Sequence, residues 1–169
     1  MRRAQRGVTL IELMVVLALA LVLLTQGLPA LGRWVVHQQL QGAQDDLHRG
    51  LLLARKSAVT RQKTIWVAIS GNGLDWRLRV SESEIGADCV AGADLLCVSH
   101  ADHAGVALDA PGRALPLRLA FTPLRGMPEN EDGSPFNELA LRLRRAGCQP
   151  TELRLLATGL VVNGEVRCP

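Results

Sequence analysis

The chain has 169 residues, enough for one modest globular domain with an appended segment and too few for two comfortable domains. Of its 19 Lys and Arg residues, three precede Gly7 (Arg2, Arg3 and Arg6); the other 16 balance the 16 Asp and Glu residues, so the pI near 8.9 derives largely from the N-terminus. This balance and an aromatic content of 3% without Tyr argue against a nucleic-acid-binding protein.

An apolar segment follows these arginines and continues to Leu28. As a helix, residues 8–28 would be about 30 Å long, which is a marginal but sufficient membrane span. A secretory signal peptide is the competing interpretation. No clean cleavage site follows the segment, however, and a helical pattern continues beyond it. Four side chains in the segment resist hydrocarbon: Thr9, Glu12, Thr25 and Gln26.

Glu12 is the one charged residue of this segment. A carboxylate near the start of a membrane helix costs a few kcal/mol on insertion scales, so its presence indicates a function and a partner. The alternative is an acid that only snorkels to the membrane surface.

The residues around Glu12 resemble the precursor motif of the type IV pilin-like family. That motif is a short basic leader, a Gly, and an apolar segment with Glu at the fifth mature position; here it reads Arg6-Gly7, then Val8-Thr9-Leu10-Ile11-Glu12. Val8 departs from the Phe that is usual in the family. The resemblance implies that a prepilin peptidase cleaves after Gly7 and N-methylates Val8. It also implies that the Glu12 carboxylate meets the N-terminal amine of a neighbouring subunit during filament assembly, a pairing that offsets its desolvation.

The leader arginines predict the orientation of the chain. By the positive-inside rule they stay in the cytoplasm, so we expect a single-pass protein of the bacterial inner membrane with its head in the periplasm. Pro29 should kink the helix without ending it, because apolar residues resume at once. Many pilin-like helices carry a proline at this distance from the cleavage site, so Pro29 adds to the resemblance.

An amphipathic pattern follows Pro29, and it predicts one helix from residue 8 to about residue 61. The expected organisation is a leader (1–7), a transmembrane or filament-core helix (8–30), its amphipathic continuation (31–62) and a β-rich head (63–169). Apolar residues recur at steps of three and four on one face: Val36, Leu40, Ala43, Leu47, Leu51, Ala54 and Ala58.

The head should consist of antiparallel strands. Alternating patterns predict a hairpin from residues 64–69 and 76–80, and later strands at 115–121, 138–144 and 152–157. Asn163 and Gly164 are typical of a two-residue hairpin turn. Residues 81–112 and 126–135 are expected to be irregular.

Four cysteines lie in the second half of the chain, without a C-x-x-C spacing that would indicate zinc or redox chemistry. In an exported head an even number of cysteines predicts disulfides. We expect Cys89 to pair with Cys97 and Cys148 with Cys168, since each pair closes a short segment. The other two connectivities and free buried thiols remain as alternatives.

The sequence predicts no metal site, no cofactor and no enzymatic activity. His100, Asp102 and His103 look like a metal cluster, but a solvated loop is the favoured interpretation because no helix or strand is expected to fix their geometry. Glu129, Glu131 and Asp132 lack the spacing of an EF-hand, so calcium binding by this acidic loop is left open. No hydrolase, Walker or zincin motif occurs, which predicts no catalytic residues and no small-molecule substrate.

The segment order resembles the subgroup of the type IV pilin-like family that contains minor pseudopilin H (GspH) and the FimT/FimU minor pilins. The resemblance implies an α+β fold, with a long N-terminal helix packed on an antiparallel β-sheet head. It also implies other pseudopilins or pilins as filament partners. Two functions fit: a minor pseudopilin of a type II secretion system, or a minor type IV pilin in pilus assembly or DNA uptake. DNA-binding members resemble one another in Gly-Arg-x-Arg, where this chain has Gly164-Glu165-Val166-Arg167, and Glu165 favours secretion.

Overall fold

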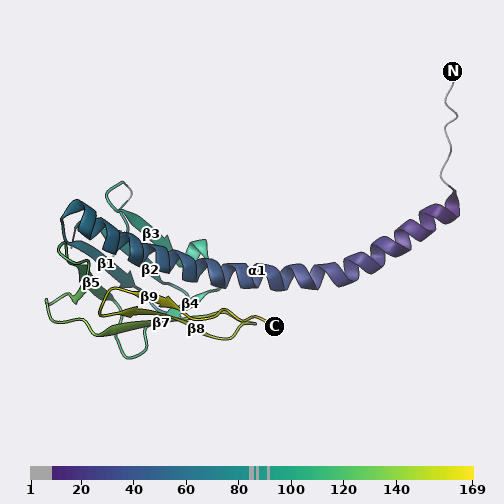
Figure 1. Ribbon diagram of the computed structural model, residues 1–169. Coiled ribbons are helices and arrows are strands. Elements are labelled where there is room, and N and C mark those ends of the chain that lie inside the picture. The colour runs from purple at the N-terminus through teal and green to yellow at the C-terminus, as the bar shows by residue number, and fades with distance from the viewer. Residues whose placement is uncertain (1–8, 84–85, 87, 91) are drawn as a thin grey trace, which may run out of the picture. The chain divides into compact units, whose positions relative to one another are not determined.

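The computed structural model describes residues 9–83, 86, 88–90 and 92–169, except the side chains of residues 26–30. The chain divides into two compact units, Met1–Val35 and Val36–Pro169. Helix α1 (Leu10–Arg61) contributes to both units, and the strands that the structure describes all belong to the second unit, the head (Figure 1).

Both ends of α1 carry capping interactions. At the start, the backbone N–H of Glu12 donates to the Thr9 hydroxyl at 3.3 Å, so Thr9 serves as the N-cap. At the end, Gln62 takes a left-handed conformation (φ 53°), and the Lys63 N–H donates to the Ala58 carbonyl at 3.3 Å. These two features form a Schellman motif in which Gln takes the position usually held by Gly. The end predicted near residue 61 is therefore confirmed.

The first sheet of the head has five antiparallel strands in the order β3-β2-β1-β5-β6. The predicted hairpin is present, and its register pairs Val67 with Val80 and Ala68 with Arg79. The strands are β1 (Ile65–Ser70), β2 (Arg77–Ser81), β3 (Leu96–Ser99), β5 (Leu117–Phe121) and β6 (Pro128–Asn130).

The second sheet has four antiparallel strands in the order β4-β7-β8-β9. A short 3-10 turn, η1 (His100–Asp102), precedes it in the chain. Gly73, in the turn between β1 and β2, exchanges two backbone hydrogen bonds with Leu108, each 2.9 Å long, and so ties the two sheets together. The strands are β4 (Ala107–Asp109), β7 (Glu138–Arg144), β8 (Thr151–Leu156) and β9 (Val161–Asn163).

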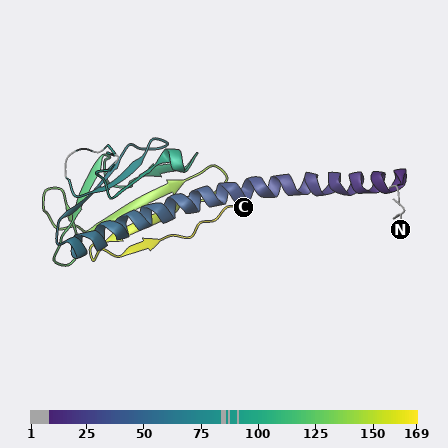
Figure 2. The ribbon, with the colours of Figure 1, turned by 90° about the horizontal axis from the view of Figure 1, so that it is seen from above.

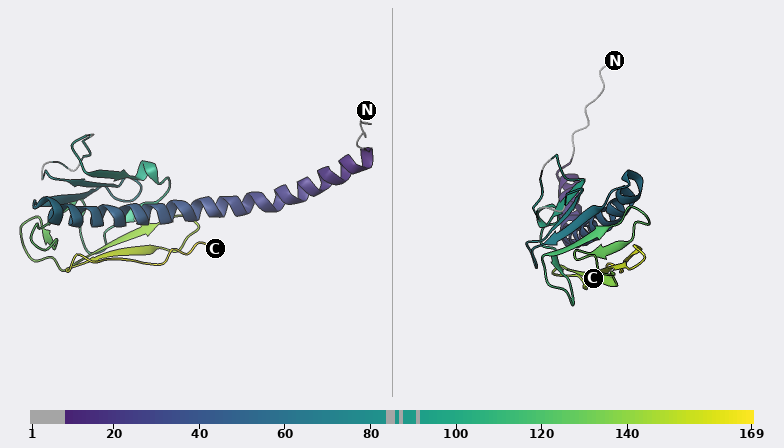
Figure 3. Two further views of the ribbon diagram at one scale, coloured as in Figure 1. Left: turned by 45° about the horizontal axis from the view of Figure 1, so that its top comes forward. Right: turned by 90° about the vertical axis from the view of Figure 1, so that its left-hand side faces the viewer.

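The core of the head lies where the second half of α1 meets both sheets. Figures 2 and 3 show this part of the helix with strands on either side of it. The predicted apolar stripe supplies six residues with 0% exposure: Leu40, Ala43, Leu47, Leu51, Ala54 and Ala58. They belong to one cluster with inward-facing residues of both sheets, such as Val67 and Leu141. The expected α+β fold, a long helix packed on antiparallel strands, is confirmed.

The segments expected to be irregular contain three short strands. β3 and β4 lie within residues 81–112, and β6 lies within 126–135. Each has only three or four residues, too few for an alternating pattern to stand out from its Gly-rich and Asp-rich surroundings. With these three strands included, the head has two sheets of five and four strands.

The hairpin predicted at Asn163 and Gly164 is wrong. β9 ends at Asn163, and the turn that joins it to β8 comes earlier, where the Gly159 N–H donates to the Leu156 carbonyl at 2.8 Å. Gly164 instead passes against β8, since its own N–H donates to the Glu152 carbonyl at 2.7 Å.

Candidate assembly site

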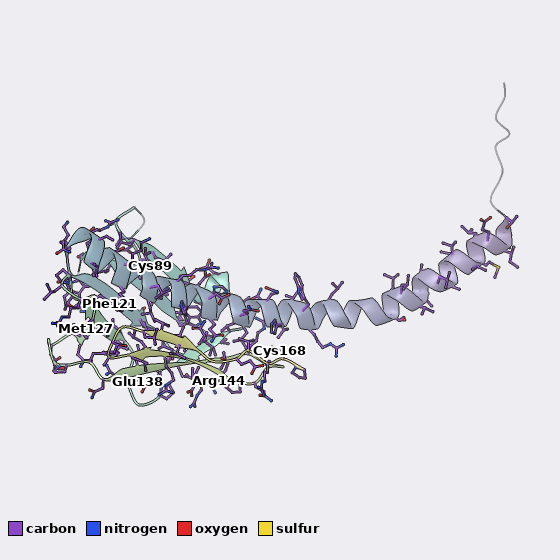
Figure 4. All side chains as sticks on the ribbon, in the orientation of Figure 1. Cys89, Phe121, Met127, Glu138, Arg144 and Cys168 are labelled. Carbon is purple, nitrogen blue, oxygen red and sulfur yellow. A yellow bond between two sulfur atoms is a disulfide. The ribbon has the colours of Figure 1, made fainter. Side chains whose placement is uncertain are left out.

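The N-terminal part of α1 exposes an apolar surface on all sides. Every Leu, Ile, Val and Met from Leu10 to Leu24 is at least 52% exposed in the isolated chain. Figure 4 shows these side chains pointing outward around the helix. A contiguous apolar surface of this extent marks a site that another molecule covers. Among the described residues, no helix combines the length and the apolar character that a membrane span requires.

Glu12 lies in the first turn of this surface. Its carboxylate is near the N-terminal end of the helix, where the backbone dipole favours negative charge. Within the described part of the chain its side chain has no hydrogen-bond or ion-pair partner, and the residue is exposed. Thr9 and Glu12 have the spacing of a capping box, T-x-x-E, a signal in the sequence that identifies Thr9 as the N-cap. This role of Thr9 was not predicted.

Two of the predicted site residues lie outside the described residues, and a third is described only in its backbone. Gly7 and Val8, where cleavage and methylation are expected, lie outside the described residues, as does the side chain of Pro29. The backbone of α1 is helical through residue 29, which agrees with a proline that does not end the helix. The kink itself stays a prediction.

The head contains two disulfides, Cys89–Cys97 and Cys148–Cys168, in the pairing expected from the sequence. The first closes the loop between β2 and β3. That loop is also held by Arg79, whose Nε donates to Asp94 at 2.8 Å, with both side chains about 95% buried. This buried ion pair was not predicted, because its two residues are ordinary members of a strand and a loop in the sequence.

The second disulfide fixes the segment after β9, which also contacts α1. The Gln44 side-chain amide donates to the Gly164 carbonyl at 2.8 Å, and His48 Nδ1 lies 2.7 Å from Asn163 Oδ1. Gln44 is 2% exposed. Helix, last strand and following segment thus form one packed edge of the head.

The C-terminal segment offers little free positive charge. The Arg167 guanidinium lies 2.5 Å from the Glu165 carboxylate, and this hydrogen bond lowers the pKa of Glu165 and raises that of Arg167. Both side chains are about two-thirds exposed, so solvent screens the pair. A phosphate approaching Arg167 meets Glu165 as well.

The prediction of a solvated loop holds for Ala101 and Asp102, which are exposed, but it is wrong for His103. His103 is 7% exposed, stacks on Trp76 with the rings 7° from parallel, and places Nε2 3.0 Å from the Asp46 carboxylate. Because it packs against α1, it fixes η1 to the helix. The sequence could not show this contact, since Asp46 and His103 are 57 positions apart.

The acidic loop uses two of its carboxylates internally. Glu131 pairs with Arg118 at 3.0 Å, and hydrogen bonds from the side chain and backbone of Ser134 lower the pKa of Asp132. Across the described residues, no group of three or more His, Cys, Asp or Glu side chains has the geometry to hold a metal ion.

Comparison with known families gives two matches. The model of the prokaryotic N-terminal methylation motif matches residues 2–25, and that of type II transport protein GspH matches residues 43–159, well over half of the chain. No curated protein matches the chain.

Among solved structures, two crystal forms of the type IV minor pilin FimU from Pseudomonas aeruginosa (strain PAO1) are similar to the chain, each with 18% identity. One has a TM-score of 0.52 and aligns over 75% of this chain and 96% of FimU; for the other the values are 0.56, 77% and 93%. At this identity the likeness establishes the fold alone.

Proposed function

The chain belongs to the family of type II transport protein GspH, and from this membership we propose that it is a minor pseudopilin of a type II secretion system. In this role it joins the periplasmic pseudopilus that helps export folded proteins across the outer membrane. The observation that carries the proposal is the match of the family model to most of the head, together with the methylation motif before it.

The methylation motif supports the processing that we propose for the N-terminus. A prepilin peptidase removes residues 1–7 by cleaving after Gly7, and the new amine of Val8 is methylated. Before assembly, the apolar helix anchors the chain in the inner membrane with the leader in the cytoplasm and the head in the periplasm. The exposed apolar surface of residues 10–25 belongs to the part of α1 that lipid covers in this state.

The same surface and Glu12 carry the proposed assembly step. When subunits associate, neighbouring α1 helices replace lipid around the apolar surface. Glu12, which lacks a partner among the described residues, then pairs with the methylated amine of the adjacent subunit. Inside a low-dielectric bundle this pairing offsets the desolvation of both charges, whereas an unpaired carboxylate would oppose association.

The assignment to secretion draws support from the C-terminal segment. The alternative, a FimU-like minor pilin in pilus assembly or DNA uptake, shares the fold, and the fold does not distinguish the two machines. DNA uptake calls for cations that are free to meet phosphates. Of the two arginines in the Gly-Arg-x-Arg motif of DNA-binding members, this chain keeps one, Arg167, and it is paired with Glu165.

Substitution of Glu12 tests the assembly role. We expect Glu12→Leu to be processed and inserted normally but to abolish incorporation into the pseudopilus. Secretion should fall at least about tenfold, because the methylated amine of the adjacent subunit would then be a buried charge without a partner. Thr25→Val is the matched control, because Thr25 is an exposed polar residue of the same segment whose hydroxyl donates to the Val22 carbonyl within the helix. The measurements are crosslinking to other pseudopilins and secretion in a null strain.

Two results would contradict these proposals. Full complementation by Glu12→Leu removes the assembly role of that carboxylate. If deletion of the chain leaves secretion intact but abolishes pili, the type II assignment is wrong and the minor-pilin alternative holds.

A further inference from the structure

A short apolar stripe on α1 lies between the apolar segment and the head. Leu31, Trp34 and Val35 are spaced at three and four residues, so they share one helix face. Their exposed fractions are 60%, 61% and 45%. All three belong to the first compact unit, and the core of the head begins after them, at Leu40. This stripe therefore needs a cover of its own.

The residue types in and beside the stripe indicate what covers it. Trp34 combines a large apolar ring with an indole N–H that requires a hydrogen-bond acceptor, and Arg33 beside it is exposed and charged. In a dry contact between helices both groups would be left without partners. The boundary between hydrocarbon and lipid headgroups instead offers an apolar layer for the ring and phosphate and carbonyl oxygens for the two donors.

The distance from Glu12 places Trp34 at such a boundary. The two residues are 22 positions apart on a continuous helix, which corresponds to about 33 Å. The hydrocarbon layer of a bilayer is about 30 Å thick. The sequence between Glu12 and Arg33 contains no Asp, Glu, Lys or Arg. Glu12 and the pair Arg33 and Trp34 thus bracket an uncharged segment of bilayer thickness.

We propose that Trp34, with Arg33, binds the lipid–water interface on the head side of the membrane and sets the depth of the unassembled subunit. The inference rests on the proposed function, because it concerns the membrane-anchored state from which subunits enter the filament. With Trp34 held at one boundary, Glu12 lies at the other, where its carboxylate keeps access to water until a partner arrives.

Tryptophan fluorescence in vesicles tests this placement. The mature chain is reconstituted into vesicles of phosphatidylethanolamine and phosphatidylglycerol that carry a quencher either next to the headgroup or at the end of the acyl chain. Trp66 and Trp76 belong to the head, and Trp76 is fully buried. The Trp34→Phe variant keeps both, so the difference between the two proteins isolates Trp34, while Trp66→Phe should preserve the Trp34 signal.

We expect the quencher next to the headgroup to reduce the Trp34 emission at least roughly twice as strongly as the quencher at the end of the acyl chain, as for an interfacial tryptophan. Equal quenching, stronger quenching from the deep position or no quenching overturns the proposal.

Flotation of the same vesicles shows whether the chain is bound to the membrane at all. It therefore distinguishes a failure of the interfacial contact from a failure of the proposed function. A chain that floats with the vesicles while Trp34 is unquenched refutes only the interfacial contact. A chain that does not float lacks the anchor itself, so both the interfacial contact and the anchored pseudopilin precursor are refuted.

Discussion

At the scale of single residues, Gly164 occupies a position that requires glycine, but the reason is close packing and not the hairpin turn that was predicted. Asn followed by Gly favours a hairpin turn because both residues tolerate positive φ. In the structure Gly164 is needed for close approach: a Cβ there would lie 2.8 Å from the Glu152 carbonyl oxygen and 3.0 Å from Thr151 Oγ1. The sequence indicates that this position needs glycine, but the contact that explains the need is with β8, which is not adjacent in the sequence.

We expect Gly164→Ala to destabilise the head by about 1–3 kcal/mol, the usual cost of forcing extra volume into a packed site. The backbone of β8 would have to move, and the hydrogen bond from Gln44 would weaken. Urea unfolding of the purified chain in mild detergent measures the change. Gly32→Ala is the control, because a Cβ at that helical position meets no atom within 4 Å. An unchanged midpoint for Gly164→Ala would show that this segment does not contribute to the fold.

The candidate site was predictable to the extent that its determinants are local. Each disulfide closes a short segment, so the sequence contains the needed information. The methylation motif also lies in one short stretch, and the roles given to Gly7, Val8 and Glu12 within it stay predictions. The contacts of His103 and Arg79 were not predictable. Each depends on a partner that only the tertiary fold brings close, Asp46 on α1 and Asp94 in a loop.

At the scale of elements, β7 carries alternating faces of different character. Its inward residues Leu139, Leu141 and Leu143 are buried, while the residues between them face solvent. Figure 4 shows Glu138 and Arg144 at the edge of the head away from α1. The exposed face has three cross-strand ion pairs: Glu138 with Arg154, Arg142 with Glu152 and Arg144 with Asp109. The alternation of apolar and polar residues predicted this strand well because one face is buried in the core and the other carries charged side chains.

The pair of Glu138 and Arg154 predicts a pH dependence. The hydrogen bond from Arg154 lowers the pKa of Glu138 from its ordinary value of 4.5. A depressed carboxyl pKa stabilises the fold above 4.5, and this contribution is lost as the pH falls through the lower folded-state value. Glu138→Gln should therefore flatten the decline of stability below pH 4.5, by a small amount because the pair is exposed.

Urea midpoints measured from neutral pH down to the acid range provide the comparison. Arg154→Gln, which removes the donor and keeps Glu138, is the matched comparison and should flatten the acid decline in the same way. A steeper acid decline in Glu138→Gln than in wild type would show that the sign of this contribution is wrong.

At the scale of the whole molecule, α1 contributes to two units that differ in how far its apolar side chains are buried. From Leu40 onward its apolar face is buried by the head, whereas residues 10–25 keep their apolar side chains exposed in the isolated chain. The amphipathic period of the second half and the continuous apolar character of the first half both appear in the sequence, so the division was foreseeable. The formation of two sheets was not, because it depends on short strands and on the Gly73–Leu108 link.

Adjacent leucines of α1 test how the head uses its helix. Leu51 is fully buried and Leu52 is 42% exposed. We expect Leu51→Ala to cost about 2–5 kcal/mol, because it leaves a cavity in the core where α1 packs on the sheets. Leu52→Ala should change stability by less than about 0.5 kcal/mol. Urea unfolding followed by the emission of the buried Trp76 measures both, and equal losses would contradict the packing of α1 described above.

The contacts of Gln44 and His48 with Gly164 and Asn163 also order events during synthesis. These residues lie 115 to 120 positions apart, so the helix emerges from the ribosome long before the segment that covers its polar edge. This edge of the head cannot close until residue 164 has been made. For that interval the polar edge of the helix lacks these partners and the head is only partly folded, a state in which chains aggregate unless a chaperone holds them. The time needed to deliver the last strand thus sets how long each new subunit depends on such protection.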